Sequence, residues 1–191
     1  MTIQLFGTKT SPYVRHCRIA LIEGGLDFEL VETDYDRSAR MTPTRRVPFM
    51  IDGEIELRDS LSILRHIRDR SRRPFFPDVQ DLDLFAMVNT ALDTAVNLFL
   101  LEKDGLTPER SPYLERQAGR VLDLLGTFEH RVDGQALEPT AASDGQIRLG
   151  CFLAWGLFRQ RFSLSAHPSL NNFLERFGGY DAFAETAPSL N

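Results

Sequence analysis

The sequence predicts a small α/β domain followed by an all-helical domain. Up to about residue 72, short strand-like runs alternate with helical segments and a hairpin signal, whereas every patterned segment beyond residue 79 has helical periodicity. The charge also changes at this point, because residues 1–79 are close to neutral and the remainder is acidic. We therefore predict a first domain at 1–72, a linker at 73–79 and a helical domain at 80–191.

The first domain is predicted to have the order β-α-β-(α)-β-β-α. Gly24 and Gly25 end its first helix, and Asp52-Gly53 is a turn signal between two apolar runs. The polar stretch 34–45 has little periodicity, so its helix is the least defined element. The expected elements are a strand at 3–6, a helix at 11–25, a strand at 27–33, a short helix within 34–45, strands at 47–51 and 54–57, and a helix at 59–73.

The second domain is predicted from apolar stripes at helical spacing. The stripe of the first helix consists of Leu84, Phe85, Val88, Leu92, Val96 and Phe99, and that of the second of Tyr113, Ala118, Val121, Leu122, Leu125 and Phe128. Ser143 and Gln146 have the spacing of a capping box ahead of an apolar run, which predicts a buried helix. A last short helix is expected at 167–177.

Composition narrows the class of protein. The 191 residues are 42% apolar and 26% charged, which is ordinary for a soluble globular protein. There is no unbroken apolar run of about 18 residues and no signal-peptide layout, so we expect a cytoplasmic protein that does not enter a membrane. Cys17 and Cys151 suit a reducing compartment, and the four histidines lack metal-ligand spacing, so no metal is expected. The basic run at 65–73 suits a helix C-terminus better than a nucleic-acid site.

Four segments in this order resemble the glutathione S-transferase family, in its bacterial type with a Ser-Pro-Tyr start. They are SPYVRHCRIAL from Ser11, TPTRRVPFMIDGEIELRDSLSILRHI from Thr42, SDGQIRLGCFLAW from Ser143 and HPSLNNFLERF from His167. The resemblance runs nearly end to end. It implies a thioredoxin-like, glutathione-binding domain, a helical domain that lines the acceptor pocket, and a homodimer.

The resemblance also implies a glutathione-binding role for two pairs of residues. Val47-Pro48 would contain a cis bond and pair through the Val47 backbone with the tripeptide. Ser60 is expected as the N-cap of the following helix, whose free N–H groups would bind the γ-glutamyl carboxylate. Asp59, where the family usually has Glu, would take the α-amino group.

Three nearby residues differ from the family or have two interpretations. Arg46 matches a position that often binds the glycine carboxylate of glutathione, although a solvated surface arginine explains it equally well. Thr42 stands where the family usually has Asn, and Arg45 stands where a small residue is common. These two differences leave the conformation of the loop open.

The sequence contains two Ser-Pro-Tyr segments, and both predict a helix start. Ser111 is interpreted as an N-cap only. Ser11 follows a strand and a short loop at the edge of the proposed site, so its hydroxyl could also donate to the sulfur of glutathione. It is the leading catalytic candidate, with Thr8, Thr10 and Tyr13 as alternatives.

The function implied by the resemblance is transfer of glutathione, as a co-substrate, to a small apolar electrophile, which is a detoxification reaction. One alternative is a non-catalytic binding or regulatory protein of the same fold, because a fold does not by itself prove a reaction. Another is glutathione-dependent isomerisation or reductive dehalogenation.

Overall fold

The computed structural model describes residues 2–134, 138 and 142–189. Contacts divide the chain into two units. The first contains residues 2–77 together with 180–189, and the second contains residues 78–179. The fold class predicted from the sequence is confirmed, because a mixed sheet with helices forms the first unit and helices form the second.

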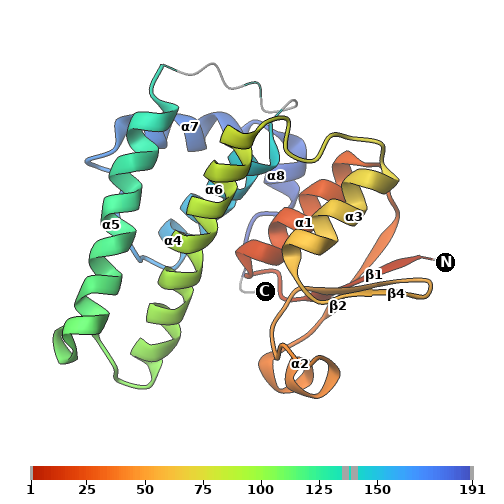
Figure 1. Ribbon diagram of the computed structural model, residues 1–191, viewed down its shortest axis with the longest axis horizontal. Coiled ribbons are helices and arrows are strands. Elements are labelled where there is room, and N and C mark those ends of the chain that lie inside the picture. The colour runs from red at the N-terminus through yellow and green to blue at the C-terminus, as the bar shows by residue number, and fades with distance from the viewer. Residues whose placement is uncertain (1, 135–137, 139–141, 190–191) are drawn as a thin grey trace. The chain divides into compact units, whose positions relative to one another are not determined.

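The first unit is built on a four-stranded sheet of order β2-β1-β3-β4. β1 is parallel to β2, and the pairs β1–β3 and β3–β4 are antiparallel. Helices α1 and α3 pack against each other over one face of this sheet (Figure 1). The elements are β1 Ile3–Gly7, α1 Pro12–Glu23, β2 Phe28–Glu32, α2 Tyr35–Met41, β3 Phe49–Asp52, β4 Ile55–Leu57, α3 Ser60–Arg70 and α8 Asp181–Glu185.

The predicted elements of this unit are present with small changes at their ends. β3 begins two residues later than predicted, after the cis Val47-Pro48 bond, and extends to Asp52. β4 begins at Ile55, because Glu54 belongs to the turn in which Gly53, with φ of +63°, takes the left-handed conformation. The short helix in the polar stretch is α2, whose first turn is capped by the Asp34 carboxylate through the Arg37 amide at 2.7 Å. The Phe6 and Phe49 rings are buried and stack on each other across the β1–β3 pair, with 4.4 Å between their centroids.

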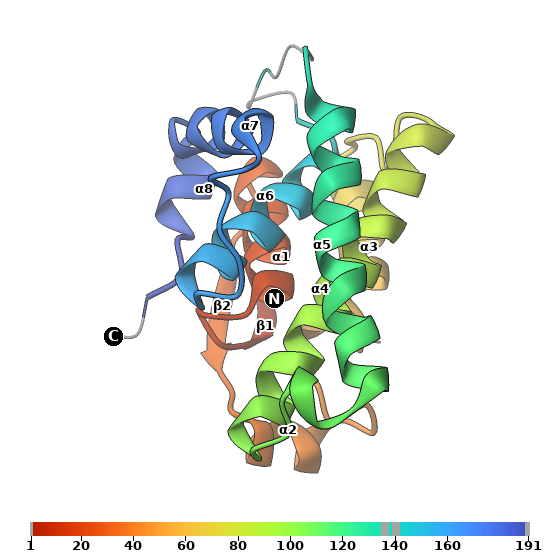
Figure 2. The same cartoon turned by 90° about the vertical axis from the view of Figure 1, so that its left-hand side faces the viewer.

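The second unit consists of four helices and a 3₁₀ turn in its described residues. They are α4 Val79–Lys103, η1 Pro108–Arg110, α5 Pro112–Val132, α6 Asp144–Phe158 and α7 Pro168–Gly178. α4 packs against both α5 and α6, and the views of Figures 1 and 2 agree that α4 and α5 lie side by side. By length and composition alone, α4 is long and apolar enough to cross a membrane. The core helix of a soluble protein meets the same two criteria.

Packing in the second unit follows the predicted stripes only in part. The capping box of Ser143 and Gln146 is confirmed, with both of its hydrogen bonds present. On α5, however, Tyr113 and Leu122 are exposed and Leu114 is buried instead. The buried face of α5 is therefore rotated slightly about the helix axis relative to the predicted face.

Candidate functional site

Three predicted site segments leave the sheet of the first unit at the same edge. β1 ends at Gly7, and because Phe6 pairs with Phe49, the start of the antiparallel strand β3 lies beside that end. Met50 in turn pairs with Leu57, which places the end of β4 at this edge as well. The loop before Ser11, the segment before Phe49 and the start of α3 are therefore neighbours.

Ser11 lies at the N-terminus of α1, as predicted. Its backbone is extended, Pro12 follows as the first helical residue, and its Oγ accepts a hydrogen bond from the Val14 amide at 3.3 Å. The Ser11 amide donates to the Thr8 carbonyl at 3.1 Å, which closes the loop between β1 and α1. The side chain is half-buried. A hydroxyl that accepts in this way keeps its proton for a second partner.

The alternative hydroxyls of this loop are arranged differently. Thr8 and Thr10 lie with their Oγ1 atoms 3.3 Å apart, so each has a hydrogen-bond partner in the other. Tyr13 is half-buried in the first turn of α1. Of the four candidates, Ser11 is the one whose side chain caps the helix start.

The segment before β3 contains a cis peptide bond between Val47 and Pro48, as the resemblance implied. Pro48 is buried and Val47 half-buried, whereas Arg46 is exposed. The two differences from the family are accommodated locally. Thr42 is buried, and its Oγ1 lies 3.0 Å from Thr44 Oγ1 and accepts from the Thr44 amide at 3.4 Å, while Arg45 has φ of +52°. Thr42 thus closes the turn that precedes the site.

The start of α3 differs from the prediction. Asp59, not Ser60, is the N-cap: its Oδ1 accepts from the Leu61 amide at 2.8 Å, and Ser60 is the buried first residue of the helix. The expected cap at Ser60 is therefore wrong by one residue. An Asp caps a helix as well as a Ser does, so the pair Asp59-Ser60 offered two possible starts. The exposed Asp59 carboxylate now lies at the positive end of the helix dipole.

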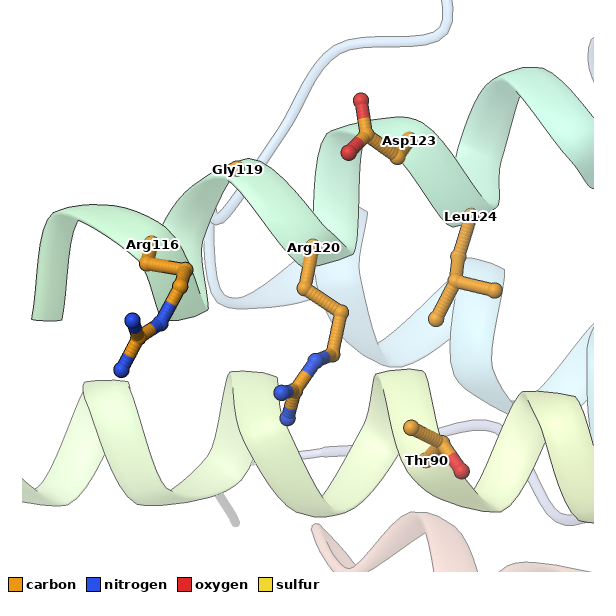
Figure 3. Close-up of a pocket in the computed structure, with 6 residues that line it drawn as sticks. All are labelled: Thr90, Arg116, Gly119, Arg120, Asp123 and Leu124. Carbon is orange, nitrogen blue, oxygen red and sulfur yellow. The ribbon is translucent and has the colours of Figure 1, made fainter. Parts of the chain in front are cut away.

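The helical unit contains an open pocket of about 590 Å³ between α4 and α5. Figure 3 shows the Arg116 and Arg120 side chains extending from α5 toward α4, and Thr90, Gly119, Asp123 and Leu124 complete the lining. These residues lie within the helical domain that the resemblance implies as the lining of an acceptor pocket, but most of them are polar. Within the residues that the structure describes, no three His, Cys, Asp or Glu side chains gather in a way that could hold a metal ion.

The sheet order, the helices over it and the cis-proline edge define a thioredoxin-like domain, which is followed here by a helical unit. Residues 5–75 match the family model of the glutathione S-transferase N-terminal domain. Glutathione S-transferase 4 of Zea mays is 32% identical over 98 residues, which are 48% of this chain and 44% of that protein. The chain thus spans less than half the length of this curated relative.

Two solved structures share the fold over nearly the full length. A glutathione S-transferase from Methylobacterium radiotolerans, in complex with glutathione sulfonate, has a TM-score of 0.86 at 22% identity, covering 100% of this chain and 97% of that one. One from Methylobacillus flagellatus, with glutathione bound, has a TM-score of 0.87 at 21% identity, covering 98% and 100%. At 22% and 21% identity these two structures show that the chain has the glutathione S-transferase fold, and residues 5–75 are similar in sequence to the N-terminal domain of that family.

Proposed function

We propose that this protein is a glutathione S-transferase that binds glutathione at the edge of its first sheet and activates the thiol for attack on an apolar electrophile. The observation that supports this most directly is the meeting of three segments at one sheet edge. They are the loop and helix start at Ser11, the Val47-Pro48 segment, and the start of α3 at Asp59. Together they offer a hydroxyl, extended backbone and the positive end of a helix dipole.

Each part of glutathione has a proposed partner there. The peptide backbone pairs with Val47, beside Pro48, and the glycine carboxylate is held by the exposed guanidinium of Arg46. The γ-glutamyl carboxylate binds the start of α3 near Ser60, where the positive end of the helix dipole favours an anion. Asp59 takes the α-amino group.

Ser11 is the proposed catalytic residue. Lowering a thiol pKa from about 8.5 by two units requires roughly 2.7 kcal/mol. A hydrogen bond to a charged group supplies about 1.5–3 kcal/mol, and a helix N-terminus adds about 0.3–1 kcal/mol. A hydroxyl at the start of α1 therefore provides stabilisation of the size that thiolate formation needs.

The thiolate then attacks the electrophile. Its electron pair forms the new carbon–sulfur bond, and a leaving group such as halide departs with the electrons of the bond that breaks. We assign the acceptor to the helical unit, and we propose a cytoplasmic, homodimeric detoxification enzyme that uses no metal, nucleic acid or membrane.

The test compares wild type with Ser11→Ala and Ser111→Ala. The two serines are matched, because both cap a helix that begins Ser-Pro-Tyr and both accept a backbone amide at 3.3 Å. Glutathione affinity is measured by calorimetry, and turnover is measured with a generic aryl halide as a function of pH.

We expect Ser11→Ala to lower turnover by about tenfold or more and to raise the apparent pKa of the bound thiol, while Ser111→Ala loses only about 1 kcal/mol of stability. Binding without turnover on a wide panel of electrophiles would instead indicate a non-catalytic binding protein. A wild-type protein that does not bind glutathione would overturn the proposal.

A further inference from the structure

The C-terminal segment 180–186 lies along α1 and contacts it at both ends. At the C-terminal end of α1, the Tyr180 hydroxyl donates to Glu23 Oε1 at 2.5 Å. Near its N-terminal end, Arg15 Nη2 donates to the Phe183 carbonyl at 2.7 Å. Tyr180 and Thr186 therefore lie toward opposite ends of α1, and the segment runs antiparallel to it. We call residues 180–186 the C-terminal clasp.

Arg15 is the centre of the contact near Ser11. Its side chain is only 4% exposed, and its Nε donates to Thr186 Oγ1 at 3.4 Å. Its Cζ atom lies 3.6 Å from the centroid of the Phe183 ring, which is cation–π geometry. A planar guanidinium is required to make these contacts at once, and a lysine ammonium lacks the same fork of donors.

Arg18, one turn further along α1, holds the same end of the clasp. Its Nη1 and Nη2 atoms donate to the carbonyls of Thr186 at 3.4 Å and Glu185 at 3.5 Å. The last carbonyls of a helix have no intrahelical partner and lie at the negative end of its dipole, so cations there are favourable. Two arginines of α1 thus bind the last turn of α8.

The other end of the clasp is held by a buried charge. Arg68 Nη1 donates to Glu23 Oε2 at 2.6 Å, and both side chains are at most 3% exposed. Burial, and then the hydrogen bond and charge of Glu23, raise the pKa of the Tyr180 hydroxyl. Tyr180 therefore stays a neutral donor to Glu23 across the neutral pH range.

The clasp reaches Ser11 through one helical turn. The Arg15 amide donates to the Ser11 carbonyl at 3.0 Å, and the Val14 amide donates to Ser11 Oγ. Arg15 is therefore held by the clasp through its side chain and bonded to the Ser11 carbonyl through its backbone amide. A shift of this turn would move the Ser11 hydroxyl with it.

We propose that Arg15 is a positioning residue for thiol activation, and that the C-terminal clasp fixes the Ser11 hydroxyl through it. The positioning role of Arg15 rests on the proposed function, in which Ser11 activates the thiol of glutathione. Its structural part, the hold of residues 180–186 on the first turn of α1, stands independently. It also gives the end of the chain a role in the first unit, although the helical unit lies between them in sequence.

The test uses full-length Arg15→Lys and Thr186→Val, with Thr186→Ser as the matched control that keeps the hydroxyl. Thr186→Val is the milder variant, because it keeps the volume and removes only the hydroxyl, which accepts from Arg15 and donates to the Ala182 carbonyl at 2.8 Å. Three quantities are measured: hydrogen–deuterium exchange of the amides at 13–17, glutathione affinity by calorimetry, and the pH dependence of thiolate absorbance for bound glutathione.

We expect faster amide exchange at 13–17 in Arg15→Lys and Thr186→Val but not in Thr186→Ser. We also expect the apparent thiol pKa to rise by about half a unit or more and kcat to fall about three- to tenfold, with a smaller change in affinity, because a small displacement of a catalytic group costs rate. Unchanged exchange in both variants would overturn the clasp, whether or not glutathione binds.

Two further outcomes separate this inference from the proposed function. Faster exchange with an unchanged thiol pKa in both variants would overturn the positioning role of Arg15. A wild-type protein without glutathione binding would refute the proposed function and the positioning role together, while the exchange data would still decide whether the clasp holds α1.

Discussion

The Asp59 carboxylate accepts a hydrogen bond from the Leu61 amide at 2.8 Å and is the N-cap of α3. It therefore occupies the helix start at which we propose that the γ-glutamyl end of glutathione binds. A carboxylate there can act in two opposite ways. It can attract the α-amino group of the ligand, or it can repel the neighbouring carboxylate.

The first prediction separates these effects with Asp59→Asn. An asparagine caps a helix about as well as an aspartate, so stability should change little. Loss of the charge should weaken glutathione binding by about fivefold, which corresponds to about 1 kcal/mol for an exposed ion pair. Calorimetric titration measures this change. Tighter binding by Asp59→Asn would show that the carboxylate repels the ligand.

The matched variant is Asp59→Ala, which removes both the charge and the cap. It should bind glutathione as weakly as Asp59→Asn or more weakly, and it should lose about 1 kcal/mol of unfolding free energy. Equal stability of the Ala and Asn variants in urea would mean that the cap contributes nothing.

The second prediction concerns Glu129 of α5, which caps a different helix. His167 precedes α7 without a side-chain cap, and Glu129 supplies one across the unit: Oε1 accepts from the Ser169 amide at 2.8 Å and Oε2 from the Leu170 amide at 2.9 Å. Burial acts to raise the pKa of Glu129, but these hydrogen bonds outweigh it and the pKa is lowered.

Glu129→Gln should lose about 1 kcal/mol of stability at pH 7, because the amide has only one oxygen for two donors. The lowered pKa means that the carboxylate stabilises the fold fully above its ordinary pKa of about 4.3, and that this contribution is lost as the pH falls through the folded value. The difference between wild type and variant in urea unfolding should therefore shrink below about pH 4. Glu175→Gln, which alters an exposed pair with Asn171 within one helix, is the control and should change little.

The strands and most helices could be predicted because their signals are local. Apolar periodicity and caps such as Ser11, Ser111 and Ser143 act within a few residues, and each of these three caps is observed. The cap of α3 was misplaced by one residue because Asp59 and Ser60 are both good caps. Local sequence does not decide between them.

The arrangement around the candidate site could be predicted only in part from the sequence. The family resemblance pointed to the segments at Ser11 and Pro48, but the pairing of β1 with β3 is what brings them to one edge. The clasp was missed, because Arg15 and Thr186 are 171 residues apart and no local pattern joins them. One signal was present: Arg15 and Arg18 lie at helical spacing on α1, whose buried face is otherwise mostly apolar.

The last prediction concerns the contact of Gly145 with Asp81 inside the helical unit. Asp81, near the start of α4, is 8% exposed and accepts hydrogen bonds from the Ser143 hydroxyl and, at 3.1 Å, from the Gly145 amide. A Cβ atom on Gly145 would lie 2.3 Å from Asp81 Oδ1 and 2.8 Å from the Asp81 backbone oxygen. The side chain could rotate away, but the backbone oxygen could not move without shifting α4.

Gly145→Ala should therefore lose about 1–3 kcal/mol of unfolding free energy, the usual range for overpacking, although alanine favours a helix. Gly126→Ala is the control, because Gly126 lies within α5 and a Cβ there would meet nothing within 4 Å. That variant should gain up to about 1 kcal/mol from helix propensity. Urea unfolding followed by circular dichroism measures both. A Gly145→Ala protein as stable as Gly126→Ala would show that α4 and α6 can separate at this contact at no cost.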